Sequence, residues 1–359
     1  MKIWDNKTTK FLYAYHNNNS PTGFESPGQK IWLDYLEPYI DDFQVDHYGT
    51  AVGTINPGKD FSVVIEAHAD EISWFVNYIS DDGFINVIRN GGSDHVIAPS
   101  KKVDIHTSKG IVKGVFGWPA IHMRRGKDAA LNPKLENIFI DVGAKDKKEV
   151  EEMGVHVGCV ITFDDQLFEL NNRFFTGRAL DNRMGGFAIA QVARMLSQNK
   201  NSLPFTLHIV NSVQEEVGLR GAQMIADTLQ PNVAIVTDVC HDTNTPLVKT
   251  KQQGDIKAGK GPTLTYAPAV HYNLLQLIID AANANEIPFQ RSASSRSTGT
   301  DTDAFAYSRS GIPSALISLP LRYMHTTVEM ADKKDVENLI LMIYHTLLTI
   351  DPNMSFKYL

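Results

Sequence analysis

Several features that would assign this chain to a particular class of protein are scarce or missing. Only two cysteines, Cys159 and Cys240, occur in 359 residues, which are too few for a disulfide framework and favour a reducing compartment. No run of Lys or Arg exceeds two residues, and the net charge is -7 with a pI near 5.9. This charge argues against a nucleic-acid partner.

Long apolar runs are missing as well. The N-terminal segment, residues 1–5, lacks the apolar stretch of a signal peptide, and no segment approaches the length of a membrane span. We therefore expect a soluble, cytoplasmic protein with no membrane partner. The remaining composition, 43% hydrophobic and 21% charged, is that of a globular chain long enough for two domains.

Helical and strand-like patterns alternate over most of the chain. Residues 63–65 form an unbroken apolar run, as in a strand buried on both faces, and residues 29–39 place their apolar side chains on one helical face. Further strands are predicted at 205–210, 233–236 and 314–318, each separated from the next by a helical pattern. The expected fold class is α/β, with a doubly wound, mostly parallel sheet covered by helices.

The pattern changes between Ile72 and about Asp164, where short β-like runs alternate with turns rich in Gly, Asp and Lys. We predict a small, β-barrel-like domain (72–164) inserted between two parts of a catalytic α/β domain, 1–71 and 165–359. Its short strands are expected to leave edges that need a partner or a cover. Residues 291–302, rich in Ser, Thr and Arg, are expected to form a loop.

Two adjacent glutamates, Glu215 and Glu216, stand where the predicted strand 205–210 gives way to a helix. This position is the carboxyl end of a strand, where open α/β sheets bind ligands. Neighbouring carboxylates raise one another's pKa unless a positive charge lies beside them, and a metal ion is the simplest such charge. The alternative is a solvated Glu-Glu turn, since charged pairs mostly lie at the surface.

Other residues that can bind metals also follow predicted strands or begin a helix. Each alone is more often a structural histidine or a helix cap, but the full set favours a shared site: His68, Asp181, Glu215, Glu216, Asp238 and His325. The two histidines and three of the four carboxylates, without a thiolate, suit two borderline-hard divalent ions such as zinc, cobalt or manganese. One carboxylate would then bridge the ions, and a remaining one would serve as a base.

The chain resembles the M42 metallo-aminopeptidases, relatives of the di-zinc M28 and M20 peptidases, over nearly its whole length. The resemblance is carried by motifs in this order: His68-Ala69-Asp70-Glu71, Ala179-Leu180-Asp181-Asn182-Arg183, Gln214-Glu215-Glu216-Val217-Gly218, Thr237-Asp238-Val239, Gly299-Thr300-Asp301 and Arg322-Tyr323-Met324-His325-Thr326. The chain departs from many relatives at Asn182 and at residues 240–244, which flank predicted ligands.

The resemblance implies a role for each of these residues. His68 and Asp238 would bind one divalent ion, Glu216 and His325 the other, and Asp181 would bridge them, with zinc as the first choice and cobalt or manganese as alternatives. Glu215 would be the general base.

The resemblance extends to residues around the ligands. Asp70 would orient His68, the alternative being a turn aspartate. Asp301 and Arg322 are candidates for the substrate pocket, or equally for a loop cap and a surface cation.

The implied activity is removal of N-terminal residues from short peptides with a free N-terminus, through a metal-bridging hydroxide and Glu215. The inserted domain would mediate dimerisation, and the dimers would be building blocks of a dodecamer.

Two rival functions remain open at this point. A carboxypeptidase or N-acyl amino acid deacylase would use the same metals and read the other end of its substrate with Arg291 or Arg296. A glycoside hydrolase or an inactive binding protein would use the glutamate pair differently. However, glycosidase carboxyls flank the bond at roughly 5 Å or more, which consecutive residues do not easily achieve.

Overall fold

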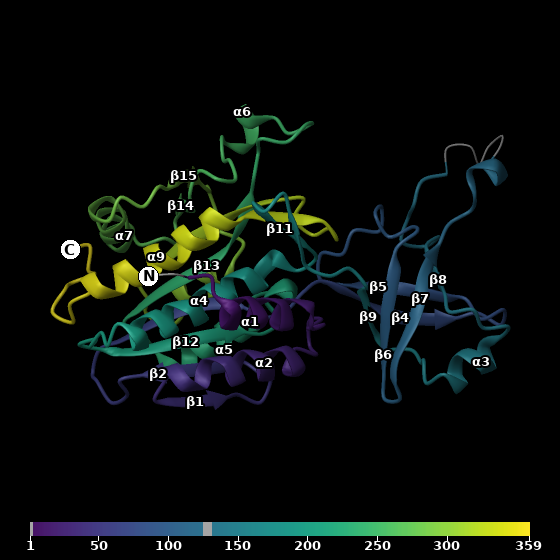
Figure 1. The fold of residues 1–359 in the computed structure, drawn as a ribbon, viewed down its shortest axis with the longest axis horizontal. Helices are drawn as coiled ribbons and strands as arrows, with labels where there is room; N and C mark the ends of the chain where they lie inside the picture. The colour runs from purple at the N-terminus through teal and green to yellow at the C-terminus, as the bar shows by residue number, and fades with distance from the viewer. Residues whose placement is uncertain (1–2, 125–130) are drawn as a thin grey trace. The chain divides into compact units, whose positions relative to one another are not determined.

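The computed structural model describes residues 3–124 and 131–359 (Figure 1). The chain divides into two compact units. The first consists of Met1–Asp70, Leu167–Met324 and Val328–Leu359, and the second of Glu71–Gln166 with His325–Thr327. Among the described residues, no helix has the length and hydropathy to cross a membrane.

The first unit is built on one large mixed sheet with the strand order β1-β2-β12-β3-β13-β16-β17-β11-β10, and β14 and β15 pair beside β16. The strands are β1 Asp42–Val45, β2 Ala51–Ile55, β3 Ser62–His68, β10 Phe168–Leu170, β11 Phe174–Gly177, β12 Thr206–Ser212, β13 Val233–His241, β14 Thr263–Tyr266, β15 Gln290–Ala293, β16 Ser314–Arg322 and β17 Glu329–Asp332.

The fold of this unit is α/β, as predicted, but its sheet is mixed rather than mostly parallel. Its central strands β12, β3, β13 and β16 are parallel, as is the pair β14 and β15, whereas the pairs toward both ends of this strand order are antiparallel. The reason lies in the connections: β1 to β2, β10 to β11 and β16 to β17 are joined by short links, which permit only antiparallel neighbours.

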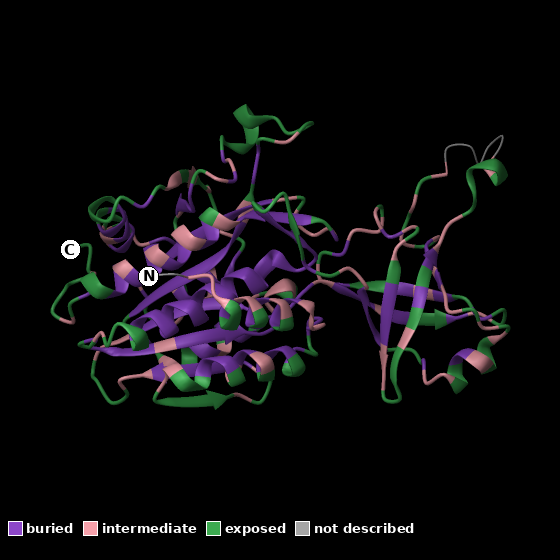
Figure 2. Cartoon of the chain, in the orientation of Figure 1, coloured by how far each residue is buried: buried purple, intermediate pink, exposed green. Residues whose placement is uncertain are grey.

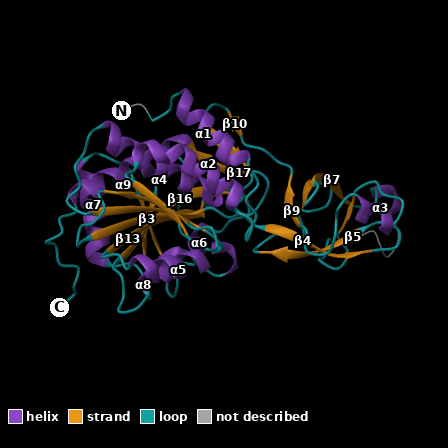
Figure 3. Ribbon diagram, turned by 90° about the horizontal axis from the view of Figure 1, so that it is seen from below, coloured by secondary structure: helices purple, strands orange, loops and turns teal. Residues whose placement is uncertain are grey.

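Helices cover both faces of the sheet (Figure 3). In that view α1, α2, α4 and α9 lie on one side of the strands, and α5 and α8 on the other. The helices of this unit are α1 Asn6–Asn17, α2 Ser26–Leu36, α4 Leu180–Gln198, α5 Arg220–Leu229, α6 Thr250–Gln253, α7 Tyr272–Ala284, α8 Asp301–Ala306 and α9 Lys333–Thr349, with short 3₁₀ helices η1 Glu37–Tyr39 and η4 Glu215–Val217.

The core of the first unit lies between the central strands and α4, where burial is continuous (Figure 2). Val63, Val64 and Ile65 are fully buried, as the apolar run predicts. Helix α4 is buried from Leu180 to Leu196. Its close packing requires Gly186, because a Cβ at that position would come 2.7 Å from the hydroxyl of Tyr15.

The second unit is a closed barrel with the strand order β4-β5-β8-β7-β6-β9. Its elements are β4 Ser73–Ile79, β5 Ile85–Asn90, β6 Lys102–Thr107, β7 Gly110–Gly117, β8 Phe139–Asp141 and β9 Val160–Phe163, with η2 Ile121–Met123 and α3 Lys147–Glu152. Trp74 and Phe116 meet edge to face in its core, 5.6 Å apart. The expectation of open strand edges is wrong, because closure pairs every strand of the barrel on both sides.

Candidate metal centre

The residues singled out in the sequence come from the carboxyl ends of the central strands and from the start of α4. His68 is the last residue of β3 and lies in register with Ser212, the last residue of β12. Asp238 lies near the end of β13, and Asp181 is in the first turn of α4. Parallel neighbours end at the same edge of a sheet, which brings these side chains together.

The ring of His68 is the centre of a cluster of carboxylates. Its Nε2 lies 3.2 Å from Asp181 Oδ1, 3.8 Å from Asp238 Oδ1 and 3.9 Å from Glu215 Oε2. The side chains of His68, Asp181, Asp238 and Glu215 are all at most 10% exposed. A set of buried anions this close together calls for a cation, because burial alone disfavours their charged forms.

Two overlapping groups of side chains in the first unit have ligand atoms within 4.8 Å of one another: His68, Asp181 and Asp238; and His68, Glu215 and Glu216. His325 belongs to the second unit. The donors of the two groups are imidazole nitrogens and carboxylate oxygens, which are ligands of zinc, cobalt and manganese. The residues present therefore fit divalent metal ions.

The electrostatics of the cluster confirm that its negative charges are poorly compensated by the protein. Burial raises the pKa of Glu215 to about 10, and Asp238 adds to this rise while His68 opposes it. Burial also raises the pKa of Asp238 well above its usual value, with Asp181 contributing. Burial lowers the pKa of His68, but Asp181 and Asp70 raise it more, so that it lies well above its usual range.

Asp70 contacts both the ring of His68 and the turn that carries Glu215 and Glu216, here called the glutamate turn. Its Oδ1 lies 3.3 Å from His68 Nδ1 and accepts a 3.0 Å hydrogen bond from the backbone N–H of Glu215. Its Oδ2 accepts from the backbone N–H of Glu216 at 3.3 Å and from the hydroxyl of Thr22 at 2.8 Å. Asp70 is fully buried, so it can fix both elements relative to each other.

The two remaining candidates for a substrate pocket have partners within the protein. Asp301 is 1% exposed, and its Oδ2 lies 2.7 Å from the hydroxyl of Ser212. Arg322 donates from Nε to Oδ2 of the buried Asp242 at 2.7 Å, and its guanidinium lies 5.3 Å from the centre of the Phe174 ring. Whether either residue also contacts a substrate stays a prediction.

The two arginines considered for an alternative substrate are placed differently. Arg291 is exposed, lies over the Phe289 ring at 4.7 Å and donates to the hydroxyl of Tyr266 at 3.4 Å. Arg296 is also exposed. Residues 290–293 form strand β15 rather than the expected loop, because they pair in parallel with β14.

Sequence reasoning missed a second layer of buried polar groups. Ser212 Oγ lies 2.6 Å from Oε1 of the fully buried Glu66 and 2.7 Å from Asp301. Because a hydroxyl has one proton to donate, one of the two carboxyls must be protonated to complete both hydrogen bonds. Strand alternation could have identified Glu66, which precedes His68 by two residues and therefore faces the same side of the sheet.

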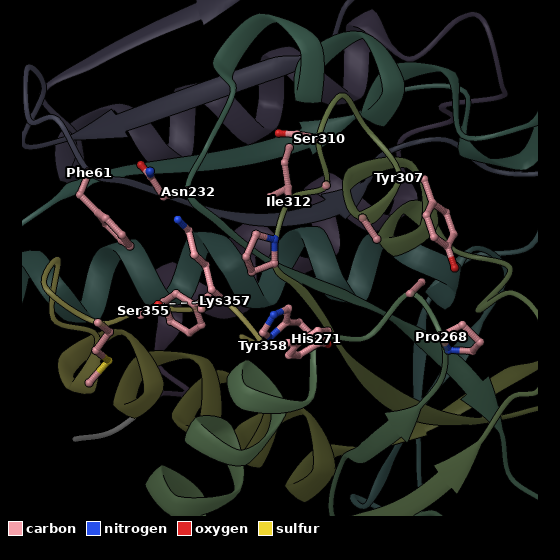
Figure 4. A pocket seen from close by; sticks show the side chains of 16 residues that line it. Phe61, Asn232, Pro268, His271, Tyr307, Ser310, Ile312, Ser355, Lys357 and Tyr358 are labelled. Carbon is pink, nitrogen blue, oxygen red and sulfur yellow. Dashed lines mark hydrogen bonds between the residues drawn. The ribbon is translucent and has the colours of Figure 1, made fainter.

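A separate cavity of about 620 Å³ lies at the amino ends of the central strands, opposite to the end that carries His68 (Figure 4). Its walls include Phe61, Asn232 and Pro313, which directly precede β3, β13 and β16, and residues 354–358 of the C-terminal segment. None of the residues described as lining it is Asp or Glu. The candidate metal ligands therefore lie away from this cavity, at the carboxyl ends of the strands, where His68 is.

Comparisons with known proteins agree with this geometry. The model of a protein family described as M42 glutamyl aminopeptidase matches residues 49–342. The chain is similar to lysyl aminopeptidase of Pyrococcus furiosus, with 34% identity over 323 residues that cover 89% of this chain and 90% of that protein.

Solved structures show the same similarity. One is a TET aminopeptidase from a marine sediment archaeon of the Thaumarchaeota, with 30% identity, a TM-score of 0.92, and coverage of 97% of this chain and 98% of that one. Another is the TET1 peptidase of Pyrococcus horikoshii, described as able to assemble into a tetrahedron or a large octahedral shell, with 26% identity, a TM-score of 0.82, and coverage of 96% and 100%. The mixed α/β fold is common to these proteins.

Proposed function

This chain belongs to the M42 glutamyl aminopeptidase family, and we propose that it is a metal-dependent aminopeptidase that removes N-terminal residues from short peptides with a free N-terminus. The observation that carries the proposal is the pair of ligand groups that share His68, one of which includes Glu215 with a side chain only 10% exposed. A peptidase needs both a bound electrophile and a base at one place.

The proposed metal ligands are assigned to two ions. His68 and Asp238 would hold one ion, Glu216 and His325 the other, and Asp181 would bridge them. Zinc is the first choice, with cobalt or manganese as alternatives, because the donor set has nitrogen and oxygen but no sulfur. The absence of a side chain at Gly92 leaves room for the ring of His325, since a Cβ at position 92 would come 2.7 Å from the Nδ1 of this ring.

When bound, the ions would lower the pKa of a water molecule and polarise the scissile carbonyl. Glu215 would take the proton of that water and pass it to the leaving amine. The two positive ions would favour the ionised form of Glu215, which a general base requires. Asp70 would hold His68 in one orientation and keep the proton on Nδ1, leaving Nε2 free as a ligand.

The free α-amino group of the substrate would be recognised by the surplus of carboxylates around His68. A positively charged amine is attracted to such a cluster, whereas an N-acylated substrate lacks the charge and a substrate carboxylate is repelled. This property would restrict cleavage to the N-terminal residue. It also separates the proposal from a carboxypeptidase or a deacylase, which would need a cation at the same place.

An assay with two substrate panels tests the proposal. We expect aminoacyl p-nitroanilides to be hydrolysed in the presence of zinc, cobalt or manganese, and N-acyl amino acids to be left intact. Hydrolysis of the N-acyl panel alone would instead support a deacylase. The same panel would give the preferred first residue, for which the family description names glutamyl and the Pyrococcus furiosus relative is a lysyl aminopeptidase.

We also propose that the protein works as a homo-oligomer in the cytoplasm. The similarity to the TET1 peptidase of Pyrococcus horikoshii, which can assemble into a tetrahedron or a large octahedral shell, supports a large homo-oligomer. The proposed assembly has a dimer as its building block and a dodecamer as its final form, with the barrel unit as the dimerisation domain. Cys159 and Cys240 are both unpaired thiols in the structure, which suits a reducing compartment. Light scattering that gives a monomer mass at micromolar concentration would refute the oligomer.

A further inference from the structure

The glutamate turn has a backbone conformation that needs support from outside. Gln214 and Leu219, which flank it, both adopt the left-handed region, with φ of 58° and 61°. Gly218 lies at φ 115°, where a glycine is required. A turn with two non-glycine residues in this region persists only when its surroundings hold it.

Two buried carboxylates supply that support. Glu25, directly before α2, accepts a 3.3 Å hydrogen bond at Oε1 from the backbone N–H of Gln214. The next two N–H groups, of Glu215 and Glu216, donate to the two oxygens of Asp70. Three successive N–H groups of the turn are thus bound by two carboxylates from different parts of the chain.

Glu25 is itself fixed by the loop that precedes α2. Its Oε1 also accepts a hydrogen bond from the backbone N–H of Gly23 at 2.7 Å, and Glu25 is only 2% exposed. Thr22, in the same loop, donates to Asp70. Burial, with a smaller contribution from the negative charge of Asp70, raises the pKa of Glu25 to about 7.

From this arrangement we infer that Glu25 is a positioning residue for the reaction: by holding the backbone at Gln214, it sets the direction in which the Glu215 carboxyl points. The inference rests on the proposed aminopeptidase function. Glu25 does not belong to any of the ligand groups around His68. It therefore acts through the turn and not on the substrate or the ions.

The test compares three variants at Glu25 with wild type. Glu25→Gln keeps an oxygen that can accept both hydrogen bonds, whereas Glu25→Asp draws the carboxylate back by one carbon and Glu25→Ala removes it. We expect Glu25→Ala to lower kcat by about 10- to 100-fold with KM within about threefold of wild type, the range seen when a supporting partner of an active-site group is lost. Glu25→Gln should restore kcat to within about threefold, and exposed Glu37→Ala is the matched control.

Hydrogen exchange of the metal-free protein gives a second readout that does not depend on activity. In Glu25→Asp and Glu25→Ala, the amides of residues 214–216 should exchange at least about tenfold faster, while α9 keeps its wild-type rate. If Glu25→Ala does not fold, Glu25→Asp carries both measurements, with an expected fall in kcat of at least about fivefold.

The outcomes separate the two claims. Unchanged exchange at 214–216, or faster exchange with kcat unchanged, would overturn the positioning role, as would a rise in KM alone. A wild-type protein that is inactive with each of the three metals would instead refute the proposed aminopeptidase function. The exchange data would still decide whether Glu25 holds the turn.

Discussion

Replacing Asp70 by Asn changes one atom in the side chain that joins His68 to the glutamate turn. The two oxygens of Asp70 serve four groups: Oδ1 faces His68 Nδ1 and the N–H of Glu215, and Oδ2 faces Thr22 and the N–H of Glu216. Asparagine can offer only one of these oxygens, and its NH₂ must face the donors on the other side.

These contacts show which of the two orientations of the asparagine amide costs less free energy of folding. If the NH₂ replaces Oδ2, the hydroxyl of Thr22 can turn and accept from it, and only the N–H of Glu216 is left without an acceptor. The opposite orientation would leave the N–H of Glu215 unpaired and place a donor against His68. We therefore expect the first, at a cost of about 1–3 kcal/mol for one unpaired, buried N–H.

The effect on metal binding should be larger than the effect on stability. Loss of the carboxylate charge beside Nδ1 weakens the hold on the ring and its tautomer, and such partners of ligating histidines are worth roughly 10- to 100-fold in metal affinity or activity. We predict a free energy of unfolding of metal-free Asp70→Asn lower by about 1–3 kcal/mol. Zinc affinity and kcat should each fall roughly 10- to 100-fold.

Asp46 provides a matched control for this experiment. Its Oδ1 accepts from the backbone N–H groups of Tyr48, Gly49 and Thr50, and Asp46→Asn keeps that oxygen while removing the same charge. Urea denaturation and competition with a zinc chelator should show a change of under about 1 kcal/mol and unchanged zinc affinity for this control. Wild-type zinc affinity and kcat in Asp70→Asn would refute the orienting role of Asp70.

Three further predictions concern the metals, the glutamates and pH. Metal analysis of protein purified without chelator should find about two divalent ions per chain, and a value of zero with Asp181→Ala fully active would contradict the site. Glu215→Gln should keep both ions and lower kcat by roughly 10²–10⁴, whereas Glu216→Gln should lose metal; equal loss of metal in both would show that their roles are wrongly assigned. Burial raises the pKa of the buried Asp335 from 3.8 to about 6, so the folded state binds this proton more tightly than the unfolded chain. The resulting stabilisation is complete below about pH 3.8, is lost as pH rises through about 6 and amounts to roughly 3 kcal/mol; urea denaturation between these pH values should show a shallower slope in Asp335→Asn than in wild type, and an equal slope in both would exclude Asp335 as a contributor.

The central part of the fold could be predicted because its signal is local. An apolar run such as 63–65 can be buried on both faces only inside a covered sheet, and the structure confirms this burial. The edges carried no such signal. Strand β1 is exposed along all four residues, and β15 reads Gln-Arg-Ser-Ala, so both are fixed by their pairing with a neighbour and not by their own pattern.

The candidate site shows the same division between local and long-range information. Residues at strand ends, such as His68 and Asp238, could be selected from the sequence because parallel strands end at one edge. The partners of Asp70 could not, because Thr22 and Glu215 are 48 and 145 residues away from it along the chain. No periodicity relates positions that far apart, so only the folded structure shows which buried donor meets which acceptor.

The geometry of their turn is compatible with the different roles proposed for the two adjacent glutamates. Consecutive side chains on the 3₁₀ helix Glu215–Val217 are separated by about 120°, since this helix has three residues per turn. Both glutamates belong to the ligand group around His68, and we propose Glu216 as a metal ligand and Glu215 as the base. A strand would have pointed the two side chains to opposite faces of the sheet, and only one could then have reached the metals. The turn keeps both at the site but in different directions, as a ligand and a separate base require.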